Sequence, residues 1–285
     1  MSLVEYARLK RHIDKRFDGL YSVLRAAELI TTWAGVQGVV RAGLADKFFS
    51  IGDQFVATFN GQPVVWDVIG IDHDKPTDPR FTHSLTIQSR DILLTAQFDA
   101  PEPDNPNSDR QQYGNNRYIH SAIRQWLNSE EEEFTWQPQH QYDMPPPTGA
   151  IYDGPGFLKL LDPELVAVLG AVDKQVARNT VTDGGGQDLF SDKVFLLSIV
   201  EVYGGSEGTT SGEAPYPYYE SLAPSPTGAA LDGRIKYLGA SVRYWRLRSP
   251  SLTGAGSPRS VGSNGSLGST PASGSVGVAP AVVIV

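Results

Sequence analysis

The 285-residue sequence contains no cysteine. This absence excludes disulfide scaffolds, thiolate zinc sites and cysteine nucleophiles, while leaving the redox compartment open. An excess of basic charge is also missing, because 24 Lys and Arg stand against 32 Asp and Glu and give a formal net charge of −8. Such a chain has no basic field to hold nucleic-acid phosphates, so we expect no nucleic-acid partner.

Long apolar runs are absent as well. No stretch reaches the roughly 18 apolar residues of a membrane span. The opening residues MSLVEYARLKRHIDKRFDG carry charges throughout and lack the apolar core of a secretory signal. We therefore expect no membrane insertion and a chain made in a cytoplasm, from which it would leave by a route such as lysis.

An apolar seam at helical spacing stands near the beginning of the chain. Its members from residue 6 to residue 27 recur three or four positions apart, which predicts an amphipathic helix close to a heptad repeat. The helix either packs on its own domain or forms a short coiled coil that oligomerises, a trimer being the first guess, or docks on a larger assembly. The candidate oligomerisation residues are Leu9, Ile13, Phe17, Leu20 and Leu24.

The rest of the chain combines a second helix with many short strands. A helix is predicted over residues 31–49, with Trp33, Val36, Val40 and Leu44 on one side. Two strand-like runs then flank Asn60-Gly61, a pair typical of a tight hairpin turn. The 29 glycines and 20 prolines favour turns and long loops between further strands. We expect an α+β fold, with a helical oligomerisation or docking segment at residues 1–47 and one domain at residues 48–285.

The end of the sequence predicts a closing strand. A Gly- and Ser-rich stretch at residues 251–275 leads into VGVAPAVVIV at residues 276–285, whose β-branched content is typical of a strand. An apolar strand of this kind needs a pairing partner. The Gly- and Ser-rich stretch is therefore expected to be an ordered loop region fixed on both sides rather than a disordered tail.

Several separate motifs, in order, resemble a family of uncharacterised domains that is abundant in Firmicutes, gut bacteria and their phages. The match covers about residues 48–285, and it departs from the family pattern at Arg246, which is inserted, and at Ala279, where Arg is common. The motifs are Gly52-Asp53, residues 65–70 with His73, residues 121–128, residues 194–202, residues 244–250 and residues 276–283. The residues assigned to the fold motif are Trp66, Trp126, Trp245, Arg248, Ser249 and Pro250.

This resemblance implies a fold and a setting. The family is similar to C-type-lectin-like folds, as found in phage receptor-binding proteins and formylglycine-generating enzymes, with a mixed core, long Gly/Ser/Pro-rich loops and a C-terminal strand that pairs near the beginning of the domain. Formylglycine-generating relatives depend on cysteines, which this chain lacks.

The sequence offers few groups for catalysis or metal binding. Asp72, His73 and Asp74 with His83 are either metal ligands or a solvated turn, and His120 is expected to be half-buried on its helix. The carboxylate pairs Asp104 with Asp109 and Asp188 with Asp192 offer an acid and a base for glycan hydrolysis. No nucleophile, zinc or phosphate-loop motif occurs. We expect no enzyme activity, no cofactor and no metal.

A cluster of tyrosines flanked by prolines is the remaining candidate binding feature. Tyr216, Tyr218 and Tyr219 either meet a ligand or fill gaps between loops. The expected function is that of a phage virion surface protein: a capsid decoration, head fibre or tail adhesin, partnered by other virion proteins and by a host-surface glycan or protein. The alternatives are a bacterial glycan- or protein-binding module with no virion role, and an enzyme on the same fold.

Overall fold

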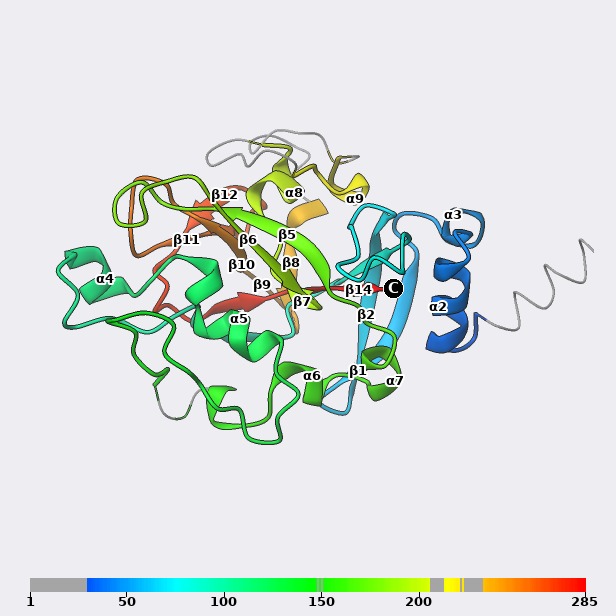
Figure 1. Ribbon diagram of the computed structural model, residues 1–285, viewed down its shortest axis with the longest axis horizontal. Coiled ribbons are helices and arrows are strands. Elements are labelled where there is room, and N and C mark those ends of the chain that lie inside the picture. Colours follow the sequence, from blue (N-terminus) through cyan, green and yellow to red (C-terminus); the bar gives the residue numbers. More distant parts are fainter. Residues whose placement is uncertain (1–29, 148, 150, 206–212, 221, 223–232) are drawn as a thin grey trace, which may run out of the picture.

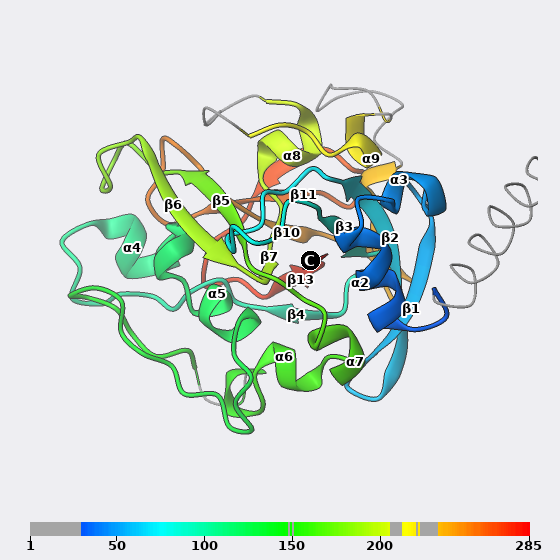
Figure 2. The same ribbon diagram turned by 45° about the vertical axis from the view of Figure 1, so that its right-hand side comes forward.

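The computed structural model describes residues 30–147, 149, 151–205, 213–220, 222 and 233–285. The seam residues Leu9, Ile13, Phe17, Leu20 and Leu24 lie outside this part. The described chain folds around two five-stranded sheets and two short hairpins, with short helices and long loops surrounding them (Figures 1 and 2). The predicted α+β class is confirmed. None of the described helices combines the length and apolarity needed to cross a membrane.

The elements are short throughout. The helices are α2 (Trp33–Arg41), α3 (Ala45–Phe48), α4 (Ser108–Tyr113), η1 (Tyr118–His120), α5 (Ala122–Leu127), η2 (Ile151–Asp153), α6 (Phe157–Leu160), α7 (Pro163–Val166), α8 (Ile199–Tyr203) and α9 (Pro217–Glu220). The strands are β1 (Gln54–Phe59), β2 (Gln62–Ile71), β3 (Leu85–Ser89), β4 (Leu94–Ala96), β5 (Val172–Ala177), β6 (Gln187–Asp192), β7 (Val194–Phe195), β8 (Lys236–Leu238), β9 (Ser241–Arg243), β10 (Trp245–Pro250), β11 (Pro258–Val261), β12 (Leu267–Ser269), β13 (Val276–Val278) and β14 (Ala281–Ile284).

The first sheet has the order β1-β2-β3-β14-β7, and all its neighbours are antiparallel. β1 and β2 form the predicted hairpin, because Asn60 and Gly61 take the positive φ values, 49° and 73°, that such a turn requires. β14 lies between β3 and β7, with Val282 opposite Ile87 on one side and Val194 on the other. The prediction that the last strand pairs near the beginning of the domain is confirmed.

The second sheet has the order β12-β11-β10-β13-β4, and its β10–β13 pair is parallel. The Gly- and Ser-rich stretch supplies both β11 and β12, so it is ordered, as expected, and more regular than expected. Every residue of β10 is buried, because the strand is central in its sheet and covered on both faces. The predicted motif residues Ser249 and Pro250 therefore belong to the interior.

The three motif tryptophans each have no exposed surface. Trp126 Nε1 donates to the Pro155 carbonyl at 3.0 Å, and Trp245 Nε1 donates to the Arg234 carbonyl at 2.8 Å. Trp66 fills the core from β2. Buried indoles of this size dominate core energetics, which agrees with their assignment to the fold motif.

α2 packs against the body of the domain beside β1 and β2 (Figure 2). Its buried side contributes Trp33, Val36 and Val40 to the core that contains the first sheet, and the Trp33 ring lies 5.2 Å from Phe55 of β1. Gln37 Nε2 donates to the Val285 carbonyl at 2.7 Å, which joins α2 to the end of β14. The boundary predicted after residue 47 stays untested for residues 1–29, whereas α2 shares the core of the body.

The prediction for the end of this helix is wrong. Leu44 is 44% exposed instead of packed with Trp33 and Val40. The helix ends at Arg41, and Gly43 then adopts a left-handed φ of 66° that starts α3 in a new direction. A continuous helix through residue 49 is interrupted by this glycine, which suits the position just past a helix end.

Candidate functional site

A group of buried charges connects the predicted motif residue Arg248 to elements far away in the sequence. Arg248 on β10 pairs with Glu201 on α8, with its Nη2 3.0 Å from Oε1 and its Nη1 also bonded to Oε2. Lys174 on β5 bonds to the same carboxylate and lies 2.7 Å from Asp74 Oδ1. These four side chains are at most 6% exposed. We call Asp74, Lys174, Glu201 and Arg248 the buried charge network.

Charge complementarity holds this network together. Burial alone would raise the pKa of Glu201, but the charges of Arg248 and Lys174 outweigh it and lower that pKa to about 2. Arg248 bonds a second carboxylate, that of Glu213, and its Nη1 also donates to the Leu196 carbonyl at 2.8 Å. Glu201 also completes the capping box of α8 by accepting from the Ser198 N–H. The network therefore joins β5, α8 and β10.

A pocket of about 270 Å³ lies over the network, and its lining includes His73, Asp74, Lys174, Glu201 and Glu213. Lys174 Nζ already contacts Asp74, Glu201 and the Tyr216 hydroxyl. Because the charged groups of the network bond one another, the arrangement is that of a structural ion-pair cluster that fixes three elements.

The structure separates the three candidate tyrosines. Tyr216 and Tyr219 are at most 1% exposed, and their hydroxyls donate to Asp74 Oδ2 at 2.7 Å and Gln88 Oε1 at 2.6 Å. Both rings fill the core under α9, as the second interpretation of this cluster expected. Tyr218, unlike the other two, is partly exposed. Ligand binding by this cluster stays a prediction, and it depends on Tyr218.

The Asp72–His83 loop does not assemble a ligand set. Asp72 Oδ2 lies 3.0 Å from His83 Nδ1 at the surface. The His73 ring instead packs against that of Tyr216, with the ring centroids 4.2 Å apart, and Asp74 points into the buried charge network. The four side chains thus occupy three different environments.

The other sequence candidates also have definite places. Asp188 and Asp192 each bind an arginine in a bidentate pair, Asp188 with Arg117 and Asp192 with Arg124. Asp104 is exposed, and Asp109 lies in the first turn of α4. His120 is partly buried, as expected. Its burial, together with the charges of Arg117 and His140, lowers the pKa of His120 to about 4.

Three separate segments meet at the end of the molecule that carries α4. Arg110 Nη2 of α4 lies 2.7 Å from Asp183 Oδ1 in the loop between β5 and β6. Asn116 Nδ2 donates to the Gly254 carbonyl at 2.7 Å, and Asn179 Nδ2 donates to Asn116 Oδ1 at 2.8 Å. The loops 179–187 and 251–257 are thereby fixed to the segment that contains α4.

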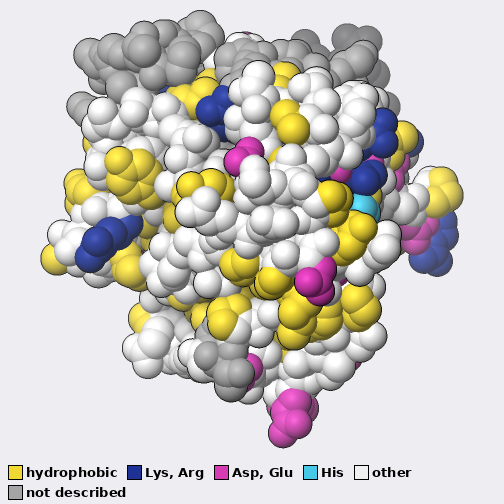
Figure 3. All heavy atoms as spheres, turned by 90° about the vertical axis from the view of Figure 1, so that its left-hand side faces the viewer, with side chains coloured by type: hydrophobic (Ala, Val, Ile, Leu, Met, Phe, Trp, Pro, Cys, Tyr) yellow, Lys and Arg dark blue, Asp and Glu magenta, His cyan; other side chains and the backbone are white. Residues whose placement is uncertain are grey.

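The exposed residues of α4 and of the loops 179–187 and 251–257 are all uncharged. We call them the loop face: Ser108, Gln111, Gln112, Thr180, Val181, Thr182, Gly184, Gly186, Gln187 and Thr253. Figure 3 views this end of the molecule and shows charged side chains sparsely scattered over a surface made mostly of backbone and uncharged side chains. Hydroxyl and amide groups on a fixed frame offer both donors and acceptors to a partner.

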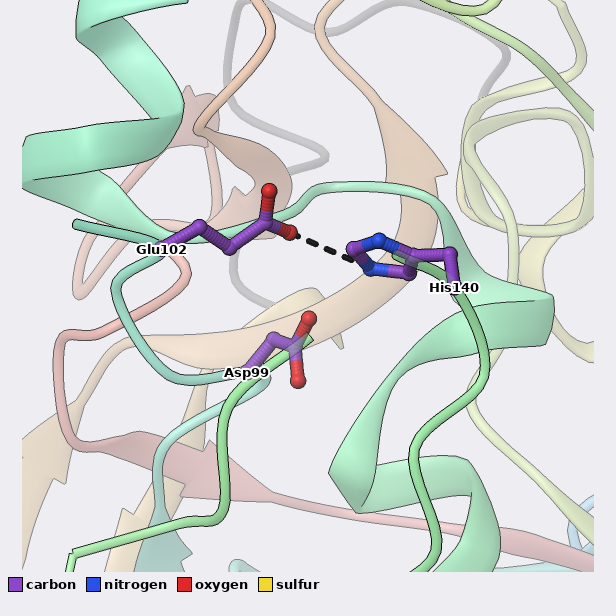
Figure 4. A group of neighbouring side chains, drawn as sticks. All are labelled: Asp99, Glu102 and His140. Atoms are coloured by element: carbon purple, nitrogen blue, oxygen red, sulfur yellow. Dashed lines mark ion pairs between the residues drawn. The ribbon is translucent and has the colours of Figure 1, made fainter. Parts of the chain in front are cut away.

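A second cluster of ionisable groups lies beneath this end. Asp99, Glu102 and His140 each offer a ligand atom within 4.8 Å of the others (Figure 4). Asp99 follows β4, Glu102 lies in the loop before α4, and His140 comes from the long loop after α5. Burial, with Asp143 and Glu102 close by, raises the pKa of Asp99 well above its usual range. Sequence analysis missed this cluster, because its members share no local spacing and meet only through loop packing.

A protein-family model matches residues 84–285 and describes them as a domain of unknown function, DUF6273. The chain belongs to the DUF6273 family. Comparisons with curated proteins and with solved structures gave no match.

The matched range contains most of the sites described above. Lys174, Glu201 and Arg248, the whole loop face and the Asp99 cluster lie inside the DUF6273 domain. α2, β1, β2 and Asp74 precede it, although β2 pairs with β3 and Asp74 bonds Lys174. The elements before residue 84 therefore complete the sheet and the charge network of the DUF6273 domain.

Proposed function

We propose that this chain is a non-catalytic surface protein of a phage particle, which presents the DUF6273 domain to a host-surface glycan or protein. The loop face carries the proposal. It is uncharged, it is rich in hydroxyl and amide groups, and hydrogen bonds of Arg110, Asn116 and Asn179 fix its three segments. A fixed frame lowers the entropy that a surface loses on binding.

The arrangement of the molecule supports display. α2 lies at one end of Figure 1, and α4 with its neighbouring loops lies at the other. The apolar seam at residues 6–27 directly precedes α2 in the sequence. A seam that oligomerises or docks on the particle would leave the loop face directed outward, as a capsid decoration, a head fibre or a tail adhesin requires.

The proposed C-type-lectin-like fold agrees with several described features. The domain has a mixed core, long loops, and a late strand, β14, that pairs with the early strand β3. The phage setting rests on the resemblance of the motifs from Gly52 to Val283 to domains of Firmicutes and their phages.

Binding to cell-wall material tests the role of the loop face. The probes are purified sacculi and neutral capsular polysaccharides from a panel of Firmicutes, with the full chain in a sedimentation or surface-binding assay. The double variant Gln112→Ala with Thr253→Ala removes two exposed hydrogen-bonding groups, which is expected to weaken binding about tenfold. The matched control is Gln62→Ala with Thr58→Ala on the β1–β2 hairpin, where both side chains are also exposed.

Detection of the chain in purified particles from an induced culture tests the virion role. A chain found only in the cell fraction, with glycan binding intact, would favour the alternative of a bacterial binding module. Equal loss of binding in the loop-face and hairpin variants would remove the loop face as the binding surface.

A further inference from the structure

The Asp99–Glu102–His140 cluster contains two buried carboxylates that each keep one oxygen without a hydrogen bond. Asp99 is 1% exposed, and its Oδ1 accepts from the Ala122 N–H at 3.2 Å while Oδ2 has no partner. Glu102 has no exposed surface, and its Oε2 accepts from Asn105 Nδ2 while Oε1 makes no hydrogen bond. Buried polar atoms normally find partners, so two such oxygens in one place point to a missing ligand.

The free oxygens face the same space as the imidazole of His140. Figure 4 shows Glu102 and His140 pointing toward one another, with Asp99 reaching the same space from below. The distance from Glu102 Oε1 to His140 Nε2 is 3.2 Å. A zinc ion with ligands at about 2.0–2.2 Å in tetrahedral geometry places neighbouring ligand atoms about 3.3 Å apart.

The hydrogen bonds of Asn115 indicate which atoms carry lone pairs here. Asn115 Oδ1 accepts the Arg117 N–H at 2.9 Å, which turns Nδ2 of the same amide towards His140 Nε2 at 2.8 Å. His140 Nε2 is then the acceptor and bears no proton. Glu102 Oε1 and His140 Nε2 therefore face each other with a lone pair on each atom, and the two lone pairs repel. A cation bound by both atoms would make this contact favourable.

Nearby charges increase the need for a cation. Asp143 Oδ1 lies 3.8 Å from His140 Nε2, and this third carboxylate has 1% of its side chain exposed. In the described part of the chain, no lysine or arginine lies within ion-pair distance of Asp99, Glu102 or Asp143. The buried charge network shows the contrast, because Arg248 and Lys174 pair with its carboxylates. Buried charges require pairing or a metal.

We propose that Asp99, Glu102 and His140 bind a divalent transition metal ion, Zn²⁺ in the first place, with Asp143 available as a further oxygen ligand. Imidazole nitrogen with carboxylate oxygens is a donor set that zinc accepts, whereas calcium takes oxygen ligands. On binding, His140 Nε2 gives its lone pair to the metal and Asn115 Nδ2 gives up its contact. The ion joins the loop before α4 to the loop after α5, so its role is structural.

The ligand set has its own supports. Ala122 N–H holds Asp99, Asn105 holds Glu102, and Gln139 N–H donates to Asp143 Oδ2 at 2.6 Å. The His120 ring lies 5.3 Å from that of His140 and packs on it. Such outer contacts orient metal ligands in proteins.

The test uses the full chain, stripped with a chelator and dialysed, and titrated with ZnCl₂ by calorimetry and with CoCl₂ by visible absorption. We expect one Zn²⁺ per chain, a Co²⁺ absorption spectrum and a rise of the thermal midpoint with Zn²⁺. His140→Gln is expected to weaken Zn²⁺ binding at least tenfold and to abolish the Co²⁺ spectrum, as is Asp99→Asn, whose amide oxygen can still accept from Ala122. Near-UV circular dichroism checks that both variants fold.

His83→Gln is the matched control, because His83 also pairs with one carboxylate, that of Asp72, but at the surface. It is expected to bind Zn²⁺ as the unaltered chain does. Absence of Zn²⁺ and Co²⁺ binding by the unaltered chain, or binding that His140→Gln leaves unchanged, would overturn the proposal.

Discussion

At the scale of the residue, Glu201 is the member of the buried charge network that bonds two cations, Arg248 and Lys174. Glu201→Gln keeps the shape of the side chain but leaves both cations without their shared counter-charge. Removing one partner of a buried ion pair typically costs about 3–5 kcal/mol. We expect a loss of this size in the free energy of unfolding, measured by urea denaturation.

Glu132→Gln is the control for this substitution. Glu132 pairs with Lys159 at the surface, where 76% of its side chain is exposed. Exposed pairs contribute little, because water screens them. Equal effects of the two variants would contradict the central role given to Glu201.

The same carboxylate predicts an acid dependence of stability. The pKa of Glu201 falls from its ordinary 4.5 to about 2 in the folded chain, with Arg248 and Lys174 overcoming the effect of burial. A folded pKa below the unfolded one means that the stabilisation is complete above pH 4.5 and is lost as the pH falls towards 2. We expect up to about 3 kcal/mol of this loss to come from Glu201.

Urea unfolding from pH 6 to pH 2 measures this dependence. In Glu201→Gln the curve of stability against pH is expected to be flatter between pH 4.5 and 2, since Gln does not titrate. A curve parallel to that of the unaltered chain would show that other carboxylates cause the acid loss.

Single residues differ in how far the sequence predicts them. Arg248 and Glu201 each belong to a motif, at residues 244–250 and 194–202, but nothing in the sequence indicates that they pair, because α8 and β10 meet only in the folded chain. Tyr216 could not be placed from the local sequence, because proline-flanked tyrosines occur both at binding surfaces and in cores. In the folded chain, its hydrogen bond to Asp74 places Tyr216 in the core.

At the scale of the element, Gly38 within α2 and Gly43 just after it are expected to respond in opposite ways to replacement by alanine. Gly38 is exposed inside α2, and a Cβ there meets nothing within 4 Å. Gly38→Ala is expected to stabilise the chain by about 1 kcal/mol, because alanine favours helix.

Gly43→Ala is the paired variant. Its φ is 66°, and a Cβ would lie 2.6 Å from His83 Nε2. Left-handed backbone costs an alanine roughly 1–2 kcal/mol before any clash, so this variant is expected to lower the thermal midpoint. A stabilising effect of Gly43→Ala in differential scanning calorimetry would contradict the helix end described here.

The sequence predicted correctly those elements whose conformation is determined by residues adjacent in the chain. The Asn60-Gly61 hairpin and β14 follow from turn preference and from β-branched content. The pairing of β11 with β10 and of β12 with β11 did not follow, because small polar residues form strands only when a neighbouring strand supplies hydrogen bonds. Leu44 was misplaced for a similar reason, since periodicity continues through Gly43 while the backbone does not.

At the scale of the whole molecule, the proposed assembly depends on the apolar seam predicted at residues 6–27. Ile13→Asp with Leu20→Asp places charges on the apolar side of the predicted helix. If the chain is a trimer through this seam, light scattering gives three times the 30.9 kDa of one chain, and the variant gives the monomer mass.

Lys10→Asp with Lys15→Asp introduces the same residue on the outer faces of that helix and is expected to leave the mass unchanged. A monomeric unaltered chain would rule out self-assembly through the seam and leave docking on another protein as its role.

The loop face was beyond sequence analysis for a topological reason. Its residues come from α4 and from the loops at 179–187 and 251–257, which Arg110, Asn116 and Asn179 bring together. Taken alone, each of these segments has the composition of an ordinary polar surface segment. Only when the three segments are brought to one end of the molecule do their uncharged exposed residues form one continuous surface.

The place of β14 has a consequence for synthesis. Ile284 of β14 pairs with Leu85 of β3, so β3 lacks this neighbouring strand until nearly 200 more residues have been synthesised. Contacts of such long range slow folding. A nascent or interrupted chain without residues 281–284 leaves the sides of β3 and β7 unpaired. Ribosome-bound and truncated forms of this protein are therefore expected to be substrates for chaperones and proteases until that strand arrives.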